Sequence, residues 1–205
     1  MLHVIQSRAR PTEDPVLRAM FVARKLVFID LLGWDLPVVD GAYEIDQFDT
    51  PEACYLVLTD AQGHHLASAR LLPTIRPHLL GSHFQALCEG GPRCASDVLE
   101  ITRFCLDRRL RATDRRLARD TLVSALAEYA LANRIAAYTA IAEPDWFRQI
   151  MAFGWRARPL GRPQAIDGQM LVALTIEIDT DTPARLRAAG IVPSRALNGD
   201  VPVAA

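Results

Sequence analysis

Lysine, paired cysteines and long apolar runs are all scarce in this sequence. Lys25 is the only lysine among 205 residues, so arginine carries nearly all of the positive charge. No apolar run approaches the roughly 20 residues that cross a bilayer as a helix. The first residues lack the basic segment and long apolar stretch of a signal peptide. We therefore expect a cytoplasmic protein that does not insert into membranes.

Missing motifs argue against two kinds of site. The four cysteines (Cys54, Cys88, Cys94 and Cys105) lack the closely spaced pairs of a zinc site, so we expect reduced, structural thiols and no bound metal. The chain also lacks a Gly-x-Ser-x-Gly sequence, which argues against a serine hydrolase. The net charge of −1 is too small to recruit nucleic acid or an anionic membrane.

The composition that remains is that of a globular domain. Half of the residues are hydrophobic, and no repeat or domain boundary is apparent, so we expect one domain over residues 1–190 and a flexible tail over residues 191–205. The order of elements favours an α/β or α+β sandwich with a central mixed, mostly antiparallel sheet flanked by helices. Hydrophobic spacing predicts helices over residues 15–32, 79–87, 115–132, 144–153 and 182–189, and strands over residues 2–6, 54–59, 66–72, 98–106, 135–141 and 168–178.

An acidic cluster lies in an expected ordered loop over residues 35–52. Glu44, Asp46 and Asp49 place three carboxylates within six residues, shortly after Phe28 and Trp34. Such charges repel one another unless they are solvated or face cations. The cluster is therefore either a solvated turn or an acidic pocket whose aromatic walls hold a positively charged small molecule.

One arginine precedes this cluster in the sequence and another follows it. Arg24 lies four residues before Phe28 in the first predicted helix, so the two side chains share a helical face. Arg70 lies within an apolar strand, where a buried charge needs a partner, and a carboxylate of the acidic cluster would serve. Strand alternation also permits Arg70 to face solvent.

The strand over residues 98–106 carries three polar or aromatic side chains in alternation. Glu100, Thr102 and Phe104 are expected on one face, with Ile101 and Arg103 on the other. A carboxylate within a strand can have a shifted pKa and act as a general base. An ion pair to a neighbouring strand is the alternative.

Arginines are concentrated where this strand leads into the next predicted helix. They outnumber the two acids of the segment, Asp107 and Asp114. The patch either docks an acidic carrier protein or phosphopantetheine, since helix N-termini favour anions, or is a solvated helix start. Its members are Arg103, Arg108, Arg109, Arg111, Arg115, Arg116 and Arg119.

Together these residues resemble the signature of the acyl-homoserine-lactone synthases, the LuxI-type autoinducer synthases. The similarity runs from about the first strand through the last, and it implies a fold like that of the GNAT acyltransferases. It rests on the order and spacing of Arg24, Phe28, Trp34, Glu44-x-Asp46-x-x-Asp49, Arg70, Phe84 and Glu100-x-x-Arg103.

The resemblance also implies a reaction. The amine of S-adenosyl-L-methionine (SAM) is acylated from an acyl carrier protein or an acyl-coenzyme A, and the intermediate cyclises to a lactone signal for quorum sensing as methylthioadenosine (MTA) leaves. SAM is a substrate, and no cofactor is implied. The segment 108–113 has no glycine, unlike the acetyl-coenzyme A turn of many GNAT enzymes, which argues against an ordinary acetyltransferase.

Site roles follow from the resemblance and from the residue types. We expect Glu100 to be the base for the amine, with Arg103, Asp46, Asp49 and Arg70 as further catalytic residues. SAM is expected to contact Arg24, Phe28, Trp34, Glu44, Phe84, Thr102 and Phe104. The acyl pocket is expected at Thr139, Ile141, Met151, Phe153 and Trp155, although core packing also suits each, and the donor is expected to dock on Arg108, Arg109, Arg111, Arg115 and Arg116.

Two other functions fit the same residues. One is a GNAT-type N-acyltransferase that acts on another amine, and the other is a SAM-binding module without turnover. The sequence fixes neither the acyl chain nor the choice between carrier protein and coenzyme A, because one methylene changes binding by only about 1–3 kcal/mol.

Overall fold

The computed structural model describes residues 1–6 and 12–194. Within them, one eight-stranded sheet has the order β1-β4-β5-β6-β7-β10-β8, and β9 pairs with β10. Every pairing is antiparallel except that of β6 with β7. The strands are β1 (Leu2–Gln6), β4 (Cys54–Thr59), β5 (His65–Pro73), β6 (Val98–Leu106), β7 (Ala137–Ala142), β8 (Arg156–Pro159), β9 (Gln164–Ile166) and β10 (Gln169–Glu177). The predicted mixed, mostly antiparallel sheet is confirmed.

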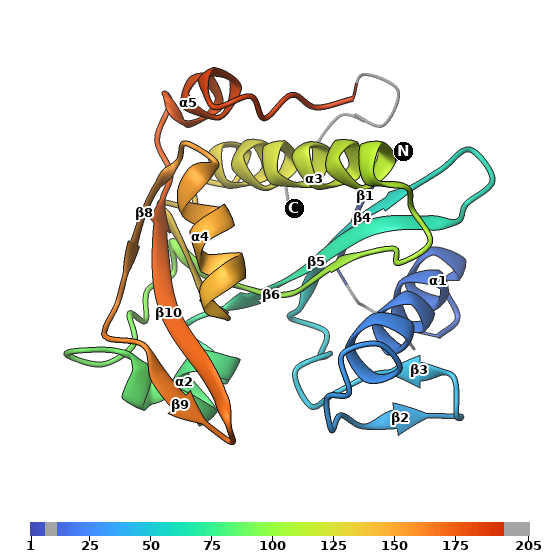
Figure 1. The fold of residues 1–205 in the computed structure, drawn as a ribbon, viewed down its shortest axis with the longest axis horizontal. Coiled ribbons are helices and arrows are strands. Elements are labelled where there is room, and N and C mark those ends of the chain that lie inside the picture. Colours follow the sequence, from blue (N-terminus) through green and yellow to red (C-terminus); the bar gives the residue numbers. More distant parts are fainter. Residues whose placement is uncertain (7–11, 195–205) are drawn as a thin grey trace.

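Helices cover both faces of this sheet (Figure 1). The helices α1 (Pro15–Arg24) and α2 (Leu79–His83) lie on one face, and α3 (Ala112–Ala132), α4 (Pro144–Ala152) and α5 (Thr182–Ala188) lie on the other. In β4, Leu56 and Leu58 pack toward α3, whereas Tyr55 and Val57 pack toward α1. All six residues of β4 are buried, which explains why this strand is apolar without alternation.

The first helix differs from its predicted form. Asp14 caps it by accepting hydrogen bonds from the N–H groups of Val16 (2.8 Å) and Leu17 (3.1 Å). The helix was expected over residues 15–32, but its α-helical part ends at Arg24 and continues as a π-helical turn over Lys25–Ile29. The wider turn rotates Phe28 relative to Arg24, so the two buried side chains reach different neighbours.

Pairing between β6 and β7 stops halfway along both strands. Val98–Ile101 pairs with Ala137–Ala140, and in the described chain no further ladder joins the two strands. On its other edge, β6 shifts register against β5 near Arg103, whose φ is +50°. Such a shift is what a β-bulge produces, and bulges redirect the side chains that follow.

Several shorter elements were not predicted. The expected loop over residues 35–52 contains a two-stranded sheet of β2 (Val38–Val39) and β3 (Tyr43–Glu44), and β8 and β9 are additional. The helix expected over residues 79–87 divides into α2 and a 3₁₀ turn, Gln85–Leu87.

The start of the expected C-terminal tail belongs to the packed structure. Ile191 is buried in the main core, and the Ser194 N–H donates to Thr121 Oγ1 at 2.9 Å. Residues 195–205 of that tail lie outside the described residues. In the part of the chain that the structure describes, no helix is long and apolar enough to cross a membrane.

Candidate active site

A buried network of ion pairs joins α1, β3 and the loop after it to β5 and β6. Arg24 binds Asp49 with both terminal nitrogens, at 2.8 and 2.9 Å, and its Nε donates to Glu44 at 2.5 Å. This bidentate geometry gives strong, directional hydrogen bonds. Arg24 thus anchors the acidic segment to the first helix.

Two more arginines extend the network from the sheet. Arg70 binds Asp46 at 2.6 and 3.0 Å, and its Nε donates to Thr102 Oγ1 at 2.9 Å. Arg103 bridges Asp46 (2.7 Å) and Glu44 (3.0 Å). The partner predicted for Arg70, a carboxylate of the acidic cluster, is confirmed, and a solvent-facing Arg70 is excluded because the residue is 1% exposed.

The six charges balance, three arginines against three carboxylates. Burial opposes ionisation of Asp49, but the charges of Arg24 and Arg70 outweigh it and hold the pKa of that carboxyl well below its usual range. Burial also opposes the charge of Arg24, yet Asp49 and Glu44 raise the pKa of its guanidinium. The carboxylates are buried and paired with arginines, so the solvated turn is wrong, whereas the pocket for a positively charged small molecule stays a prediction.

Aromatic rings pack against this network. Phe28 and Trp34 stack with centroids 5.0 Å apart and planes 16° from parallel. The Arg103 guanidinium lies 5.7 Å from the Phe28 ring centre, which is within cation–π range. The predicted grouping of Phe28, Trp34 and the acidic cluster therefore exists, with Arg103 between the rings and the carboxylates.

Glu100 lies on the same face of β6 as Thr102 and faces the start of α2. Its two oxygens accept the N–H groups of Leu79 and Leu80, each at 2.7 Å. Burial raises the pKa of Glu100, although these two hydrogen bonds and the nearby His78 favour the ionised form. The carboxylate is not among the groups that line the cavity described below.

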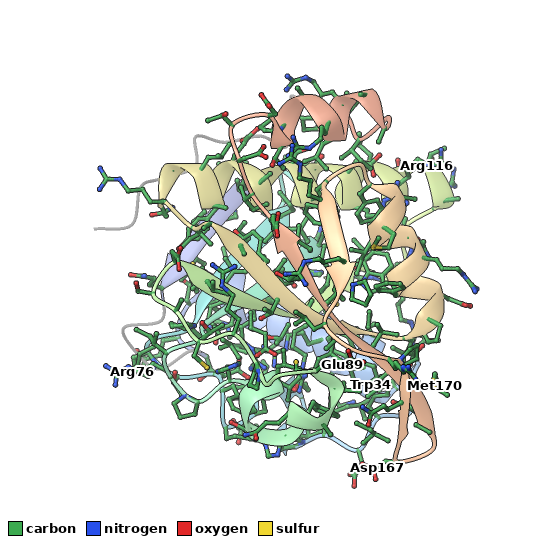
Figure 2. All side chains as sticks on the ribbon, turned by 90° about the vertical axis from the view of Figure 1, so that its left-hand side faces the viewer. Trp34, Arg76, Glu89, Arg116, Asp167 and Met170 are labelled. Atoms are coloured by element: carbon green, nitrogen blue, oxygen red, sulfur yellow. The ribbon has the colours of Figure 1, made fainter. Side chains whose placement is uncertain are left out.

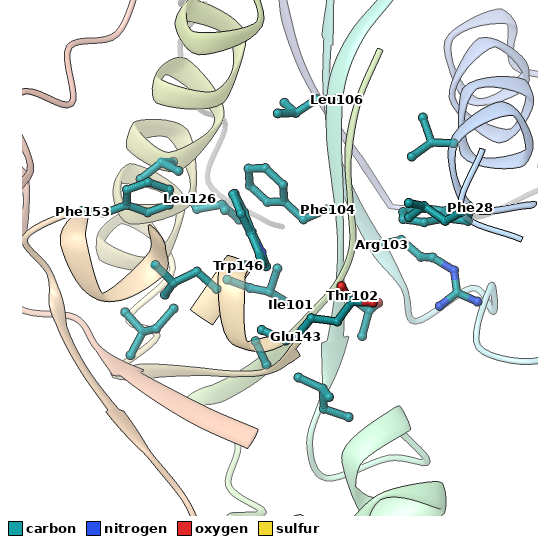
Figure 3. A pocket seen from close by; sticks show the side chains of 18 of the residues that line it. Phe28, Ile101, Thr102, Arg103, Phe104, Leu106, Leu126, Glu143, Trp146 and Phe153 are labelled. Carbon is teal, nitrogen blue, oxygen red and sulfur yellow. The ribbon is translucent and has the colours of Figure 1, made fainter. Parts of the chain in front are cut away.

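The bulge in β6 places Phe104 on a different face of the strand from Glu100 and Thr102. Phe104 was predicted to lie beside Glu100 and Thr102, but it packs with Ile101 and Leu106 on the α3 side. Arg103, predicted on the opposite face from Glu100, reaches the ion-pair network instead. Figure 3 shows Phe104 and Trp146 on one side of β6, with Phe28 and Arg103 on the other. The register shift at Arg103 is the physical reason, because it reverses the alternation.

A cavity of about 300 Å³ opens where β6 and β7 are no longer paired. Phe28, Trp34, Thr102 and Arg103 line one part of it. Arg115 and Glu143 also line it, and the other lining side chains are apolar. Rings there contact each other in series, with centroid distances of 5.1 Å for Phe104–Trp146 and 5.8 Å for Trp146–Phe153 and Phe153–Trp155. The apolar lining includes Leu106, Val123, Leu126, Ile141, Trp146, Ile150, Phe153, Trp155 and Ile176.

The predicted acyl-pocket residues divide into two groups. Ile141, Phe153 and Trp155 line the cavity, whereas Thr139 is fully buried away from it and Met151 is 40% exposed on α4. Sequence reasoning missed Trp146 and Ile150. Trp146 and Ile150 are four residues apart, and Phe153 follows three residues later. This spacing places all three on one face of a helix and would have identified them.

Other predicted site residues lie farther from the cavity. Phe84 packs beside Leu80 and Leu87 and does not line it. Among the patch arginines, Arg109 pairs with Asp107 at 2.7 Å, while Arg115 lines the cavity and donates to the Asp107 carbonyl at 3.1 Å. Arg108, Arg111 and Arg116 are exposed. In the described residues, no three His, Cys, Asp or Glu side chains gather as a metal site would require.

Comparison with known proteins identifies the family of the chain. The autoinducer synthase family matches residues 10–186. The acyl-homoserine-lactone synthase of Ralstonia nicotianae is 37% identical over 186 residues, which cover 85% of this chain and 89% of that protein. The Pseudomonas aeruginosa synthase is 35% identical and covers 74% of each chain. The chain belongs to the acyl-homoserine-lactone synthase family. It is therefore an acyltransferase, as predicted.

Solved structures of similar proteins agree with this membership. BjaI, a CoA-dependent acyl-homoserine lactone synthase solved with SAM and isopentyl-CoA, is 27% identical with a TM-score of 0.83, covering 95% of this chain and 90% of that one. TofI, solved with an inhibitor and MTA, is 30% identical with a TM-score of 0.76, covering 93% and 99%. An N-acetyltransferase from Lactobacillus plantarum, 21% identical with a TM-score of 0.61, shares the fold alone and covers 87% and 99%. The predicted GNAT-like fold is confirmed.

Replacing Asp49 tests the ion-pair network of the synthase. Arg24 keeps Glu44 and Arg70 keeps Asp46 in Asp49→Asn, but three buried arginines then face only two carboxylates. Because one buried positive charge is no longer balanced, we expect a loss of about 3–5 kcal/mol of unfolding free energy, or roughly 10 °C in Tm at pH 7. The pKa of Asp49 is lowered in the folded state. Asp49 therefore contributes fully to the free energy of unfolding above the ordinary carboxyl pKa of about 4, and this contribution is lost as the pH falls below it.

Thermal unfolding between pH 7 and pH 3 measures both effects. The Tm of Asp49→Asn is expected to fall less steeply with acid than that of the wild type. Asp30→Asn is the control, since Asp30 pairs with Lys25 at 2.9 Å in a half-exposed position and such pairs contribute at most about 1 kcal/mol. If Asp49→Asn had the Tm of the wild type and the same change of Tm with pH, Asp49 would not stabilise the ion-pair network.

Proposed function

We propose that the chain acylates the amine of SAM from an acyl thioester and then closes the lactone with release of MTA. The single observation that carries this is the cavity between β6 and β7, because its ring-lined polar part and its apolar part suit an amine substrate and an acyl chain in contact. The solved relatives with SAM, isopentyl-CoA and MTA support the same assignment.

In the first step, the acyl chain occupies the apolar part of the cavity, against Trp146 and Phe153. The SAM nitrogen attacks the thioester carbonyl, the C–S bond breaks and the thiol leaves with a proton. Backbone N–H groups of β6 beyond Ile101, which are not paired with β7, supply donors for the oxyanion. Phe104 belongs to the acyl wall in this proposal.

In the second step, the substrate carboxylate attacks the carbon bonded to the sulfonium. A C–O bond forms, the C–S bond breaks, and the electron pair neutralises the sulfur of MTA. Phe28 and Trp34 hold the cation or the adenine, and the ion-pair network of Asp46, Asp49 and Arg70 fixes Arg103 and Thr102 beside them. Holding the two reacting groups together supplies the proximity that the step needs.

Expression in a heterologous host tests the reaction. Mass spectrometry is expected to find an N-acyl-homoserine lactone in the medium, and purified protein with SAM and an acyl thioester is expected to release MTA. An acylated amine without MTA would instead indicate an N-acyltransferase on another substrate. SAM binding without any product would indicate a module that has lost turnover. The substrates are cytoplasmic, so we also place the protein there.

Glu100 is proposed to act as base for the amine, directly or through a water. Glu100→Gln is expected to lower turnover about a hundredfold while the Kd for SAM changes far less. Since Glu100 also holds α2, the control is Leu79→Pro, which removes one of its N–H donors but keeps the carboxylate. Proline suits the first position of α2, and His78 before it is already extended, with φ −142° and ψ 164°.

Both variants are compared in steady-state kinetics and in SAM binding. Turnover that survives in Leu79→Pro and is lost in Glu100→Gln supports the base. Equal losses in the two variants would mean that Glu100 acts only by positioning α2, and unchanged turnover in Glu100→Gln would remove it from the mechanism.

The exposed arginines near the start of α3 are proposed to dock the acyl donor. Arg116→Glu is expected to raise the KM for an acyl carrier protein severalfold and to weaken its dependence on salt, because a favourable surface charge is reversed. Arg76→Glu is the control, since Figure 2 shows Arg76 on the opposite side of the molecule from Arg116. Equal KM values for the two variants would remove the patch from the account.

A further inference from the structure

One acidic side chain lines the cavity and has taken no part so far. Glu143 follows directly after β7 and precedes α4, and it is exposed where the cavity meets solvent. Figure 3 shows it projecting into the space between the two separated strands, on the Thr102 side. Among the described residues that line the cavity, Glu143 is the only acid, and the other charged side chains there are Arg103 and Arg115.

The remaining carboxylates near the site are already engaged. Glu44, Asp46 and Asp49 each bind two arginines, and both oxygens of Glu100 accept backbone N–H groups. By contrast, no basic group within residues 1–6 and 12–194 forms an ion pair with Glu143. The Glu143 carboxylate is therefore available to a ligand in a way that the acidic cluster is not.

SAM brings a positive charge to this place. It carries a sulfonium, an ammonium and one carboxylate, and the ammonium nitrogen is the atom that receives the acyl group. That nitrogen must lie beside the acyl part of the cavity, which Glu143 lines. We propose that Glu143 binds the ammonium group of SAM through a charge-assisted hydrogen bond. This proposal rests on the proposed function.

The contact has a defined kinetic consequence. The nitrogen is cationic in bound SAM and becomes cationic again as it attacks the carbonyl, so the contact is made in the ground state and in the transition state alike. Uniform binding of this kind lowers KM without changing kcat. Acylation then leaves a neutral amide, so the contact is released before the lactone closes.

Glu143→Gln removes the charge and keeps the shape of the side chain. We expect the KM for SAM to rise about tenfold, with kcat within about threefold of the wild type and the KM for the acyl donor unchanged. Asp145→Asn is the matched control. Asp145 is two residues farther along in the first turn of α4, its side chain is 84% exposed beside Arg148, and it does not line the cavity. It is expected to leave all three constants within about twofold.

Equilibrium binding to the full chain identifies the group that Glu143 contacts. S-adenosylhomocysteine has the ammonium without the sulfonium, and MTA has neither. Glu143→Gln is expected to weaken SAM and S-adenosylhomocysteine equally and to leave MTA unchanged. Weakening of SAM alone would overturn the assignment in favour of the sulfonium, and unchanged binding of all three would overturn any role in SAM recognition.

The wild-type protein separates the two levels of failure. If it binds SAM and releases MTA while Glu143→Gln behaves in the same way, the role of Glu143 is wrong and the proposed function stands. If the wild type neither binds SAM nor releases MTA, the proposed function fails, and the role of Glu143 fails with it.

Discussion

The site depends on the buried ion pairs that three arginines form with three carboxylates beside α1. The partners come from α1, β3 and its following loop, β5 and β6, segments far apart in sequence. Removing such charges from water is costly, and only this complete mutual pairing compensates for it. The geometry of Thr102 and Arg103 at the cavity therefore depends on Arg24 and Asp49, which are linked to them through Glu44 and Arg70.

The loss of pairing between β6 and β7 is the second determinant of the site. Two parallel strands that are paired throughout leave no space between them, whereas here pairing ends at Ile101 and Ala140. The bulge at Arg103 then directs one side chain toward the ions and the next, Phe104, toward the apolar cavity. A single strand thus contributes to both the polar and the apolar part of the site.

Local patterns in the sequence predicted much of this fold. The bounds of β4 and β6 agree with the structure, because β4 is a mostly apolar run that ends at a turn and β6 alternates polar and apolar residues over part of its length. The partner of Arg70 was also predictable, since a charge in an apolar strand needs a counter-ion. The π-helical turn was not predictable, nor was the side of Phe104, because both depend on how separate segments pack. The engagement of Glu100 with α2 depends likewise on where Leu79 and Leu80 lie in space.

The position of Lys25, the only lysine of the sequence, has a practical consequence. Its amine lies on the π-helical turn that also carries Phe28, and Asp30 holds it at 2.9 Å. An amine-reactive probe has no other side chain to modify, and only the α-amino group competes with it. A fluorophore attached there would sit one helical turn from the rings at the cavity, as a single-site reporter of occupancy installed without mutating the protein.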